Sequence, residues 1–239
     1  MLAAEAVRLA AIEILCPTAA VEAETGFPTL AGYRVYDSRE VALQDLDREK
    51  AYTPVLALHT VESGVALRGE ASPAGDVAAD AVMDVIAELA VVAGDEDGQF
   101  ADAAPMAETD PSARLVLAAL CAQVRMLLER SVSGGEWRRL VKRISRVDMQ
   151  TFAVPEIGAR WQRVTMRFHL AIRDDDFDME GGGLPEPVRS LYEALPAGSY
   201  ARGKLAELAA AFNGETLPPL EAVKITTSAI DSGPNDLSD

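Results

Sequence analysis

The sequence predicts an α+β domain in which a mostly antiparallel or mixed β-sheet is flanked by helices, with a helical and extended C-terminal arm. Three observations carry this prediction. Residues 161–173 alternate apolar and polar side chains, as in a strand with one covered face. Two stretches, residues 2–15 and 111–130, repeat apolar residues at helical spacing. Apolar residues form 49% of the 239-residue chain, which is enough for a substantial core.

The first part of the chain is expected to begin with a helix and to pass into a short strand. Apolar residues recur at helical spacing over residues 2–15, and Pro17 lies just beyond the expected end of that helix. Turn residues at 25–32 lead into a short strand at 33–36. The charged stretch 37–50 then predicts a loop.

A buried strand is expected next. The apolar run 54–60 predicts it, with Pro54 at the first position, where a missing N–H costs least. A turn at 62–64 follows. The glycines and the proline of residues 65–75 predict an irregular segment.

Residues 76–92 fit two structures. Every fourth residue is acidic, which suits one edge of a helix and equally one face of a strand. The acidic residues are Asp76, Asp80, Asp84 and Glu88. Like charges at this spacing weaken an isolated helix, and the final Leu-Ala-Val-Val prefers a strand. The sequence therefore favours a strand here and leaves a helix open.

The middle of the chain is predicted to contain a loop, two helices and a hairpin. Glycine and aspartate at 93–110 predict a polar loop, and a capping Asp followed by Pro begins the helix at 111–130. A short helix is expected from residue 137. Strands at 144–154 and 161–173, joined by a Pro-Gly turn, make an antiparallel hairpin.

The composition changes near residue 175, so we divide the chain there. Residues 1–175 are expected to form the core domain, and residues 176–239 a C-terminal helical and extended arm. Gly181–Gly183 is expected to act as a flexible linker, with helices at 187–195 and 201–212. The last ten residues are predicted to be disordered.

Charge is strongly segregated along the chain. Residues 1–110 carry 6 Lys and Arg against 21 Asp and Glu, and residues 174–239 carry 4 against 13. Residues 111–173 carry 12 against 4, although the whole chain has a net charge of −16. Folding must bring these opposite charges together, within one subunit or between neighbouring subunits.

Three interpretations of the basic block stay open. The first is that the block binds nucleic-acid phosphates. The second is that it pairs with acidic residues inside the fold, and the third is that it pairs with the acidic face of a neighbouring subunit. The overall acidity and the few aromatic residues favour protein contacts. The predicted subunit-interface residues are Arg138, Arg139, Lys142, Arg143, Arg163, Arg167 and Arg173.

No segment predicts catalysis, a metal site or a cofactor. His59 and His169 each lie in an expected strand without further ligands at metal spacing, so structural roles are favoured. The acidic run from Asp174 lacks the glycine and the final glutamate of a calcium-binding EF-hand loop. Cys16 and Cys121 are expected to be buried free thiols in a reducing compartment. We expect no secretory signal, and no segment that approaches the roughly 20 apolar residues needed to span a bilayer.

The order of elements resembles the tail terminator proteins of long-tailed bacteriophages and phage-like particles such as gene transfer agents. The resemblance covers residues 1–175 and rests on the N-terminal helix, the strand Thr53–Thr60, the run ending in Glu88–Val92, the long helix and the strand Arg160–Phe168. It implies a small, non-enzymatic α/β subunit of a hexameric ring that caps the tail tube and joins it to the head. The C-terminal arm departs from that pattern.

The resemblance also implies partners and a location. The ring would contact the tail tube protein and a head-tail connector or stopper protein, without a membrane, in a particle assembled in the bacterial cytoplasm. An acidic lumen would let DNA slide through without sticking. The predicted lumen residues are Asp76, Asp80, Asp84, Glu88, Asp95 and Asp97. The rivals are another connector or tail-completion protein, a cytoplasmic α/β module that binds a small ligand, and a hydrolase with an unrecognised carboxylate site.

Overall fold

The chain folds into one mixed six-stranded sheet with helices packed on it, which confirms the predicted α+β class. The computed structural model describes residues 1–69, 73, 77–95, 98–105, 111–130, 135–154, 159–178 and 182–212. The strands are β1 (Val35–Asp37), β2 (Thr53–Leu67), β3 (Val77–Asp95), β4 (Gly98–Ala103), β5 (Val141–Val154) and β6 (Ala159–Ile172).

The helices come from both ends and from the middle of the chain. They are α1 (Leu2–Leu15), α2 (Thr18–Ala23), α3 (Pro111–Arg125), α4 (Gly135–Leu140), α5 (Val188–Ala194) and α6 (Tyr200–Phe212). A 3-10 turn, η1 (Leu43–Asp45), precedes β2, and a π-helical turn, η2 (Met126–Arg130), continues α3.

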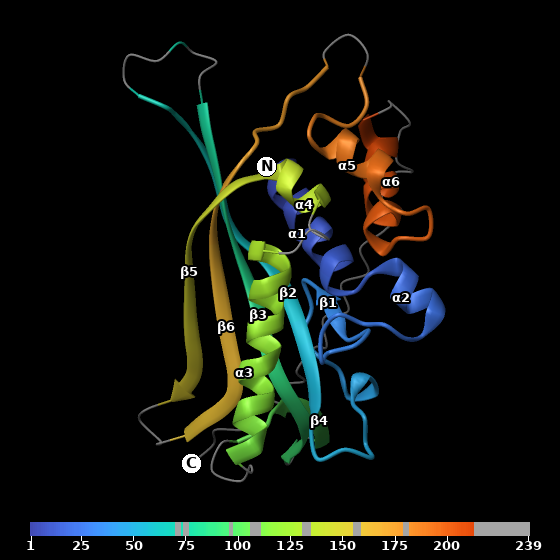
Figure 1. Cartoon of the computed structure of the whole chain (residues 1–239), viewed down its shortest axis with the longest axis vertical. Helices are drawn as coiled ribbons and strands as arrows, with labels where there is room; N and C mark the ends of the chain where they lie inside the picture. Colours follow the sequence, from blue (N-terminus) through green and yellow to red (C-terminus); the bar gives the residue numbers. More distant parts are fainter. Residues whose placement is uncertain are drawn as a thin grey trace, which may run out of the picture.

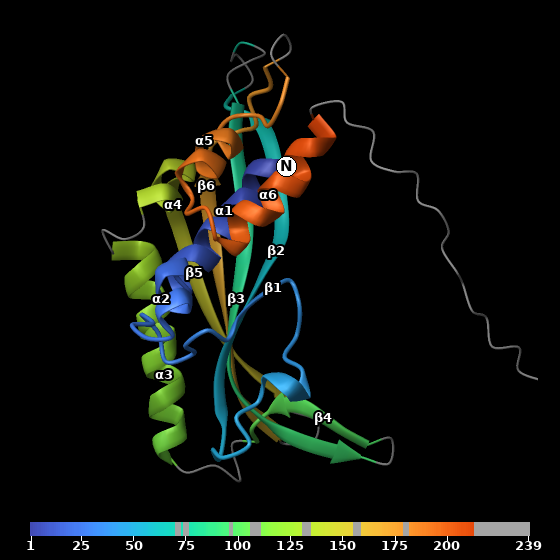
Figure 2. The same ribbon diagram turned by 90° about the vertical axis from the view of Figure 1, so that its right-hand side faces the viewer.

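The strands lie in the order β1-β2-β3-β6-β5, with β5 at one edge and β1 and β2 at the other (Figure 1). β1 runs parallel to β2, and the pairs β2–β3, β3–β6 and β6–β5 are antiparallel. β4 pairs with the far end of β3, and this ribbon bends out of the sheet away from the helices (Figure 2). The predicted strand over 76–92 and the predicted hairpin of β5 and β6 are both confirmed.

One face of the sheet carries the main core. The apolar side of β6 is fully covered there, with Met166, Phe168 and Ile172 at 0% exposure. α3 lies along β3 and β6, and α1 packs beside it against β2 (Figure 1). α1 is buried on nearly every side, because α4, α5 and α6 cover the part of it that the sheet does not reach.

The opposite face is only half covered. The segment between β1 and β2 folds over its lower part and closes a small second cluster of Tyr36, Val55, Ala57 and Ala90. No described helix lies on the rest of this face, as Figure 2 shows from the side. We call this surface the open face.

The N-terminus of α1 is capped from far along the chain. Asp175 accepts hydrogen bonds from the backbone N–H groups of Leu2 (2.8 Å) and Ala3 (2.7 Å). A helix begins with N–H groups that have no partner inside the helix, and a carboxylate there also suits the helix dipole. The end of β6 therefore fixes the position of the first helix.

The segment after residue 175 packs into the same core. Leu184, Val188, Leu191 and Leu205 belong to the apolar cluster that contains α1. Arg189 donates from Nη2 to the carbonyl of Gly182 (2.8 Å), which holds the described part of the predicted linker against α5. The boundary predicted at residue 175 therefore does not coincide with a break in the core. The tail predicted to be disordered lies outside the described residues.

Three sequence-based expectations for local structure were wrong. β2 runs through the expected turn at 62–64 and into the expected irregular segment at 65–75, and it ends at Leu67; β4 occupies 98–103, where a loop was expected. Helix α2 was missed. These segments are weakly patterned, and β2 and β4 owe their strand conformation to pairing with the long β3.

The helix formed by α3 and η2 differs from the expectation that no segment could span a bilayer. By length and composition alone, residues 111–130 are long and apolar enough to cross a membrane. In the structure Leu117, Leu120 and Val124 on this helix are buried in the core. Its apolar side is thus already occupied by the sheet.

Candidate subunit interface

Acidic and basic residues face each other across the two central strands of the open face. The carboxylates of β3 and the arginines of β6 each recur at every fourth position, so both sets stay on one face of their strand. The antiparallel register places Asp84 opposite Arg167 and Glu88 opposite Arg163. Opposite charges on directly facing positions stabilise a sheet.

Glu88 and Arg163 form the more buried of the two pairs. Arg163 donates from Nε to Oε2 of Glu88 at 2.6 Å, and the Glu88 side chain is only 4% exposed. Burial raises the pKa of Glu88, and the neighbouring guanidinium opposes this change. The carboxylate therefore depends on Arg163 to stay ionised.

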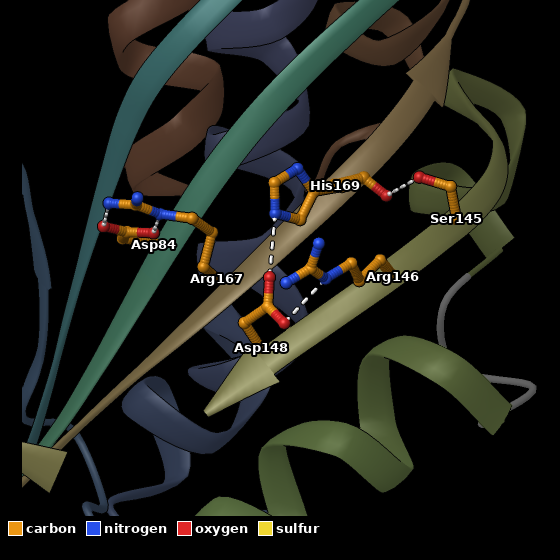
Figure 3. A network of polar contacts seen from close by, with 6 residues as sticks. All are labelled: Asp84, Ser145, Arg146, Asp148, Arg167 and His169. Carbon is orange, nitrogen blue, oxygen red and sulfur yellow. Dashed lines mark hydrogen bonds and ion pairs between the residues drawn. The ribbon is translucent and has the colours of Figure 1, made fainter. Parts of the chain in front are cut away.

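Asp84 and Arg167 form a two-point pair that is closer to solvent. Nε and Nη2 of Arg167 donate to the two carboxylate oxygens of Asp84 at 2.9 and 2.8 Å (Figure 3). Asp84 is buried, whereas the Arg167 side chain is 45% exposed. The planar guanidinium matches the carboxylate geometry, which fixes the register of β3 on β6.

A second network joins β6 to β5 beside this pair (Figure 3). Asp148 accepts from Nε of Arg146 (2.7 Å) and lies 3.1 Å from Nε2 of His169. The hydrogen bond from Arg146 holds the pKa of Asp148 below its usual range. Ser145 donates to the backbone carbonyl of His169 (2.9 Å). His169 therefore links two strands.

These contacts correct the roles that the sequence predicted for four residues. Arg163 and Arg167 were expected at a subunit interface, and Asp84 and Glu88 in a channel lining. The structure pairs them with one another inside a single chain. Because both carboxylates are buried, neither is available to line a channel. Pairing inside the fold, one of the three open interpretations of the basic block, holds for these two arginines.

The other predicted basic residues lie at the upper end of the β5 edge. Arg138, Lys142, Arg143 and Arg173 are exposed, and within the described part of the chain their side chains make no hydrogen bond or ion pair. Arg139 contacts Glu136 at 3.3 Å. We call the three residues Arg138, Lys142 and Arg143 the basic edge.

Two hollows adjoin this end of the sheet. One, of about 460 Å³, is lined by Lys142 and Arg143 together with Arg68 and Asp80. The other, of about 620 Å³, lies between α4, the end of β6 and α5, and Arg173 and several carboxylates line it. Both are open, charged depressions, which suit contact with another macromolecule better than capture of an apolar ligand.

The remaining predicted lumen residues are only partly described. Asp80 is exposed on the open face, on the same side of β3 as Asp84. Asp95 ends β3, and the structure describes its backbone alone. Asp76 and Asp97 lie outside the described residues.

A polar cluster at the opposite edge was not predicted. Arg8 of α1 contacts Asp37 at the end of β1 at 2.7 Å, and the hydroxyl of Tyr200 donates to the same carboxylate at 2.9 Å. Burial, and this hydrogen bond, raise the pKa of Tyr200 to about 12. These three residues join α1, β1 and α6. No local pattern could have found a cluster whose members lie so far apart in sequence.

Metal binding has no geometric support in the part of the chain that the structure describes. Among those residues no group of three or more His, Cys, Asp or Glu is placed to hold an ion. His59 lies opposite Asp84 in the register of β2 and β3. Cys16 and Cys121 are free thiols, and burial raises the pKa of each to about 11, so neither is an activated nucleophile.

Comparison with known proteins adds no relative. No protein-family model, curated protein or solved structure matches this chain.

Proposed function

We propose that this chain is a non-enzymatic structural subunit of a phage-type tail or neck, a tail terminator that assembles into a hexameric ring. The ring caps the tail tube and joins it to the head, so its partners are the tail tube protein and a connector or stopper protein. DNA contacts it only in passing through the lumen of the virion or phage-like particle.

The observation that carries the proposal is a pair of exposed β-ribbons. The end of the β2–β3 hairpin rises above β5 and β6, and the β3–β4 ribbon leaves the sheet at its other end (Figures 1 and 2). Both carry large apolar side chains that are more than 40% exposed. These are Val61, Val65 and Leu67 on the first ribbon and Val92 and Phe100 on the second.

Ribbons of this kind gain stability from neighbours. A two-stranded hairpin is only marginally stable in water by itself, and apolar side chains gathered at such a site are typical of an interaction surface. Ribbons at both ends suit a subunit that meets neighbouring copies within a ring as well as partners along the ring axis. The helix-flanked sheet also agrees with the fold that the resemblance to tail terminators implies.

The acidic lumen remains part of the proposal in reduced form. Asp84 and Glu88 are paired with arginines, and Asp80 shares a hollow with Arg68, Lys142 and Arg143, so the lining would come from the end of β3 at Asp95. Carboxylates there repel DNA phosphates, which favours free passage of the genome.

The direct test is the size and shape of the purified protein. Mass photometry at micromolar concentration and negative-stain electron microscopy are expected to show closed rings. A chain that stays a monomer or a dimer under these conditions contradicts the proposal.

Substitutions on the ribbon refine this test. Replacing both Val65 and Leu67 by Ser should weaken assembly without unfolding the subunit, because these side chains are already exposed. Leu115→Ser on α3 is the matched control, since Leu115 is the most exposed of the large apolar residues described, at 72%. If the ribbon variant assembles as well as the control, the apolar side chains of the ribbon do not contribute to assembly.

One observation favours a second candidate, a module that binds a small ligand. A pocket of about 480 Å³ between α1, α2 and β1 is lined in part by Cys16, Tyr36 and Tyr200. The buried hydroxyl of Tyr36 has no hydrogen-bond partner among the described residues, and burial raises its pKa to about 12, so it stays a neutral donor.

A thermal-shift screen of small polar compounds discriminates the two candidates. A ligand that raises the Tm of the wild type but not of Tyr36→Phe, in a protein that forms no ring, would favour the second function. Rings without any such ligand would favour the first.

A further inference from the structure

The sheet leaves a strand edge unpaired on each side. β5 is the last strand on one side, and no described backbone group pairs with its outer edge. On the other side β1 covers β2 only at Leu56–Leu58, so β2 has an unpaired outer edge beyond His59 within the described residues. Unpaired strand edges are templates for another strand.

The register of the sheet shows which parts of the two edges lie at the same height. Followed through β3 and β6, Glu62 of β2 is level with Arg146 of β5, and Val65 is level with Val141. The unpaired part of β2 beyond His59 is therefore level with the start of β5, beside Lys142 and Arg143. A stretch of this length is sufficient for a short strand pair.

The charges on the two edges are opposite. The basic edge of Arg138, Lys142 and Arg143 lies beside the start of β5. The β1–β2 edge presents exposed carboxylates that make no hydrogen bond or ion pair with the described residues: Glu22, Glu24, Glu40 and Glu62. We call these the acidic edge.

We propose that the partner of each edge is the opposite edge of a second copy of this chain, so that subunits join head to tail. The basic edge and β5 of one subunit then meet the acidic edge and β2 of the next. This inference rests on the proposed ring and names the contact that builds it. Complementary charge sets the orientation, and strand pairing supplies the backbone hydrogen bonds.

The strand directions agree with this contact. The antiparallel pairs of the sheet make β2 and β6 run one way and β3 and β5 the other. A second sheet added in the same orientation therefore places its β2 antiparallel to β5 of the first, which continues the alternation. A contact between two different surfaces can be repeated from copy to copy, and it closes into a ring when the rotation allows.

A charge-swap experiment on the full chain tests the inference. Variant one carries Lys142→Glu and Arg143→Glu, and variant two carries Glu40→Lys and Glu62→Lys. Each places like charges across the contact, so each should weaken self-assembly at least about tenfold by mass photometry. An equimolar mixture should restore rings in which the two variants alternate, because each altered edge then meets the oppositely altered edge and each unaltered edge meets an unaltered one.

The control changes the same charge elsewhere. Arg125→Glu with Lys204→Glu, on the exposed sides of α3 and α6, alters the net charge as variant one does, removes only two surface ion pairs and should leave assembly unchanged. Circular dichroism of every variant shows that the monomer is folded.

The outcomes separate the two proposals. Wild-type rings that neither variant weakens would overturn the edge contact and leave the ring function standing. Weakening by variant one alone, with variant two normal, would overturn the head-to-tail contact in favour of a symmetric β5–β5 contact. A wild type without any ring would defeat the proposed function itself.

Discussion

The centre and the edge of the open face carry the same kinds of charge in different circumstances. In the centre, Arg163 and Arg167 on β6 are matched by Glu88 and Asp84 on β3, and the carboxylates are buried. At the edge, Lys142 and Arg143 on β5 are exposed and make no ion pair with the described residues.

A block of like charge in a sequence can serve two different purposes in the fold. Basic residues in one block of sequence divide into two groups once the strands pair. The central group has its acidic partners inside the chain and supports the fold, whereas the edge group remains accessible to another molecule. Position across the sheet, rather than charge, separates the two roles.

The largest effect should come from breaking the most buried central pair. Arg163→Ala leaves Glu88 buried without its partner, and we expect a loss of about 2 kcal/mol in the free energy of unfolding, measured by urea denaturation. The double variant Glu88→Met with Arg163→Met removes both charges and should be closer to the wild type than Arg163→Ala. If Arg163→Ala unfolds at the same urea concentration as the wild type, the ion pair does not contribute to the stability of the fold.

A smaller effect should appear in the pH dependence of Glu88. Burial raises the pKa of Glu88 above its ordinary value of 4.5. The folded chain then holds this proton more readily than the unfolded chain, so the contribution of Glu88 to stability falls as pH rises through the window above 4.5. The stability of Glu88→Gln relative to wild type should therefore increase from acidic to neutral pH. The opposite slope would mean that Arg163 outweighs burial.

The more exposed central pair should contribute less. Arg167→Ala is expected to cost about 1 kcal/mol, since Asp84 is buried but Arg167 is partly in water. Arg167→Lys keeps the charge, loses the two-point geometry and should recover only part of this loss. Chemical denaturation of the three proteins in parallel measures it, and full recovery by Lys would show that charge alone matters.

The smallest effect on folding should come from the edge. Lys142→Ala with Arg143→Ala should change the unfolding free energy of the monomer by less than about 0.5 kcal/mol, because neither side chain has a described partner to lose. A loss as large as that of Arg163→Ala would contradict the distinction between centre and edge. The measurement is a urea titration at a concentration where the subunit is monomeric.

Strong periodicity made part of this fold predictable. The strict alternation of Arg163, Val164, Thr165, Met166 and Arg167 could only suit a strand with one covered face, and β6 is such a strand. α1 and α3 were equally clear. Residues 98–103 look like a loop because glycine and aspartate are poor strand formers, and only pairing with β3 makes them β4.

The sequence predicted only part of the arrangement of the central ion pairs. Carboxylates at 84 and 88 and arginines at 163 and 167 share a spacing of four, so each set was known to lie on one face of its strand. Their pairing depends on β3 lying next to β6, and α3, α4 and β5 separate these strands in the chain. Sequence order does not reveal that adjacency, which is why pairing inside the fold and contact with a neighbour could not be separated.

The cap on α1 has a consequence for synthesis on the ribosome. Asp175 is 173 residues beyond Leu2, the first N–H that it accepts. At about 5–20 residues per second, the helix waits about 10–30 s before its capping carboxylate is even made. During that interval the almost wholly apolar α1 lacks both its cap and much of its cover. This feature makes the newly synthesised chain a natural client for chaperones that shield apolar helices.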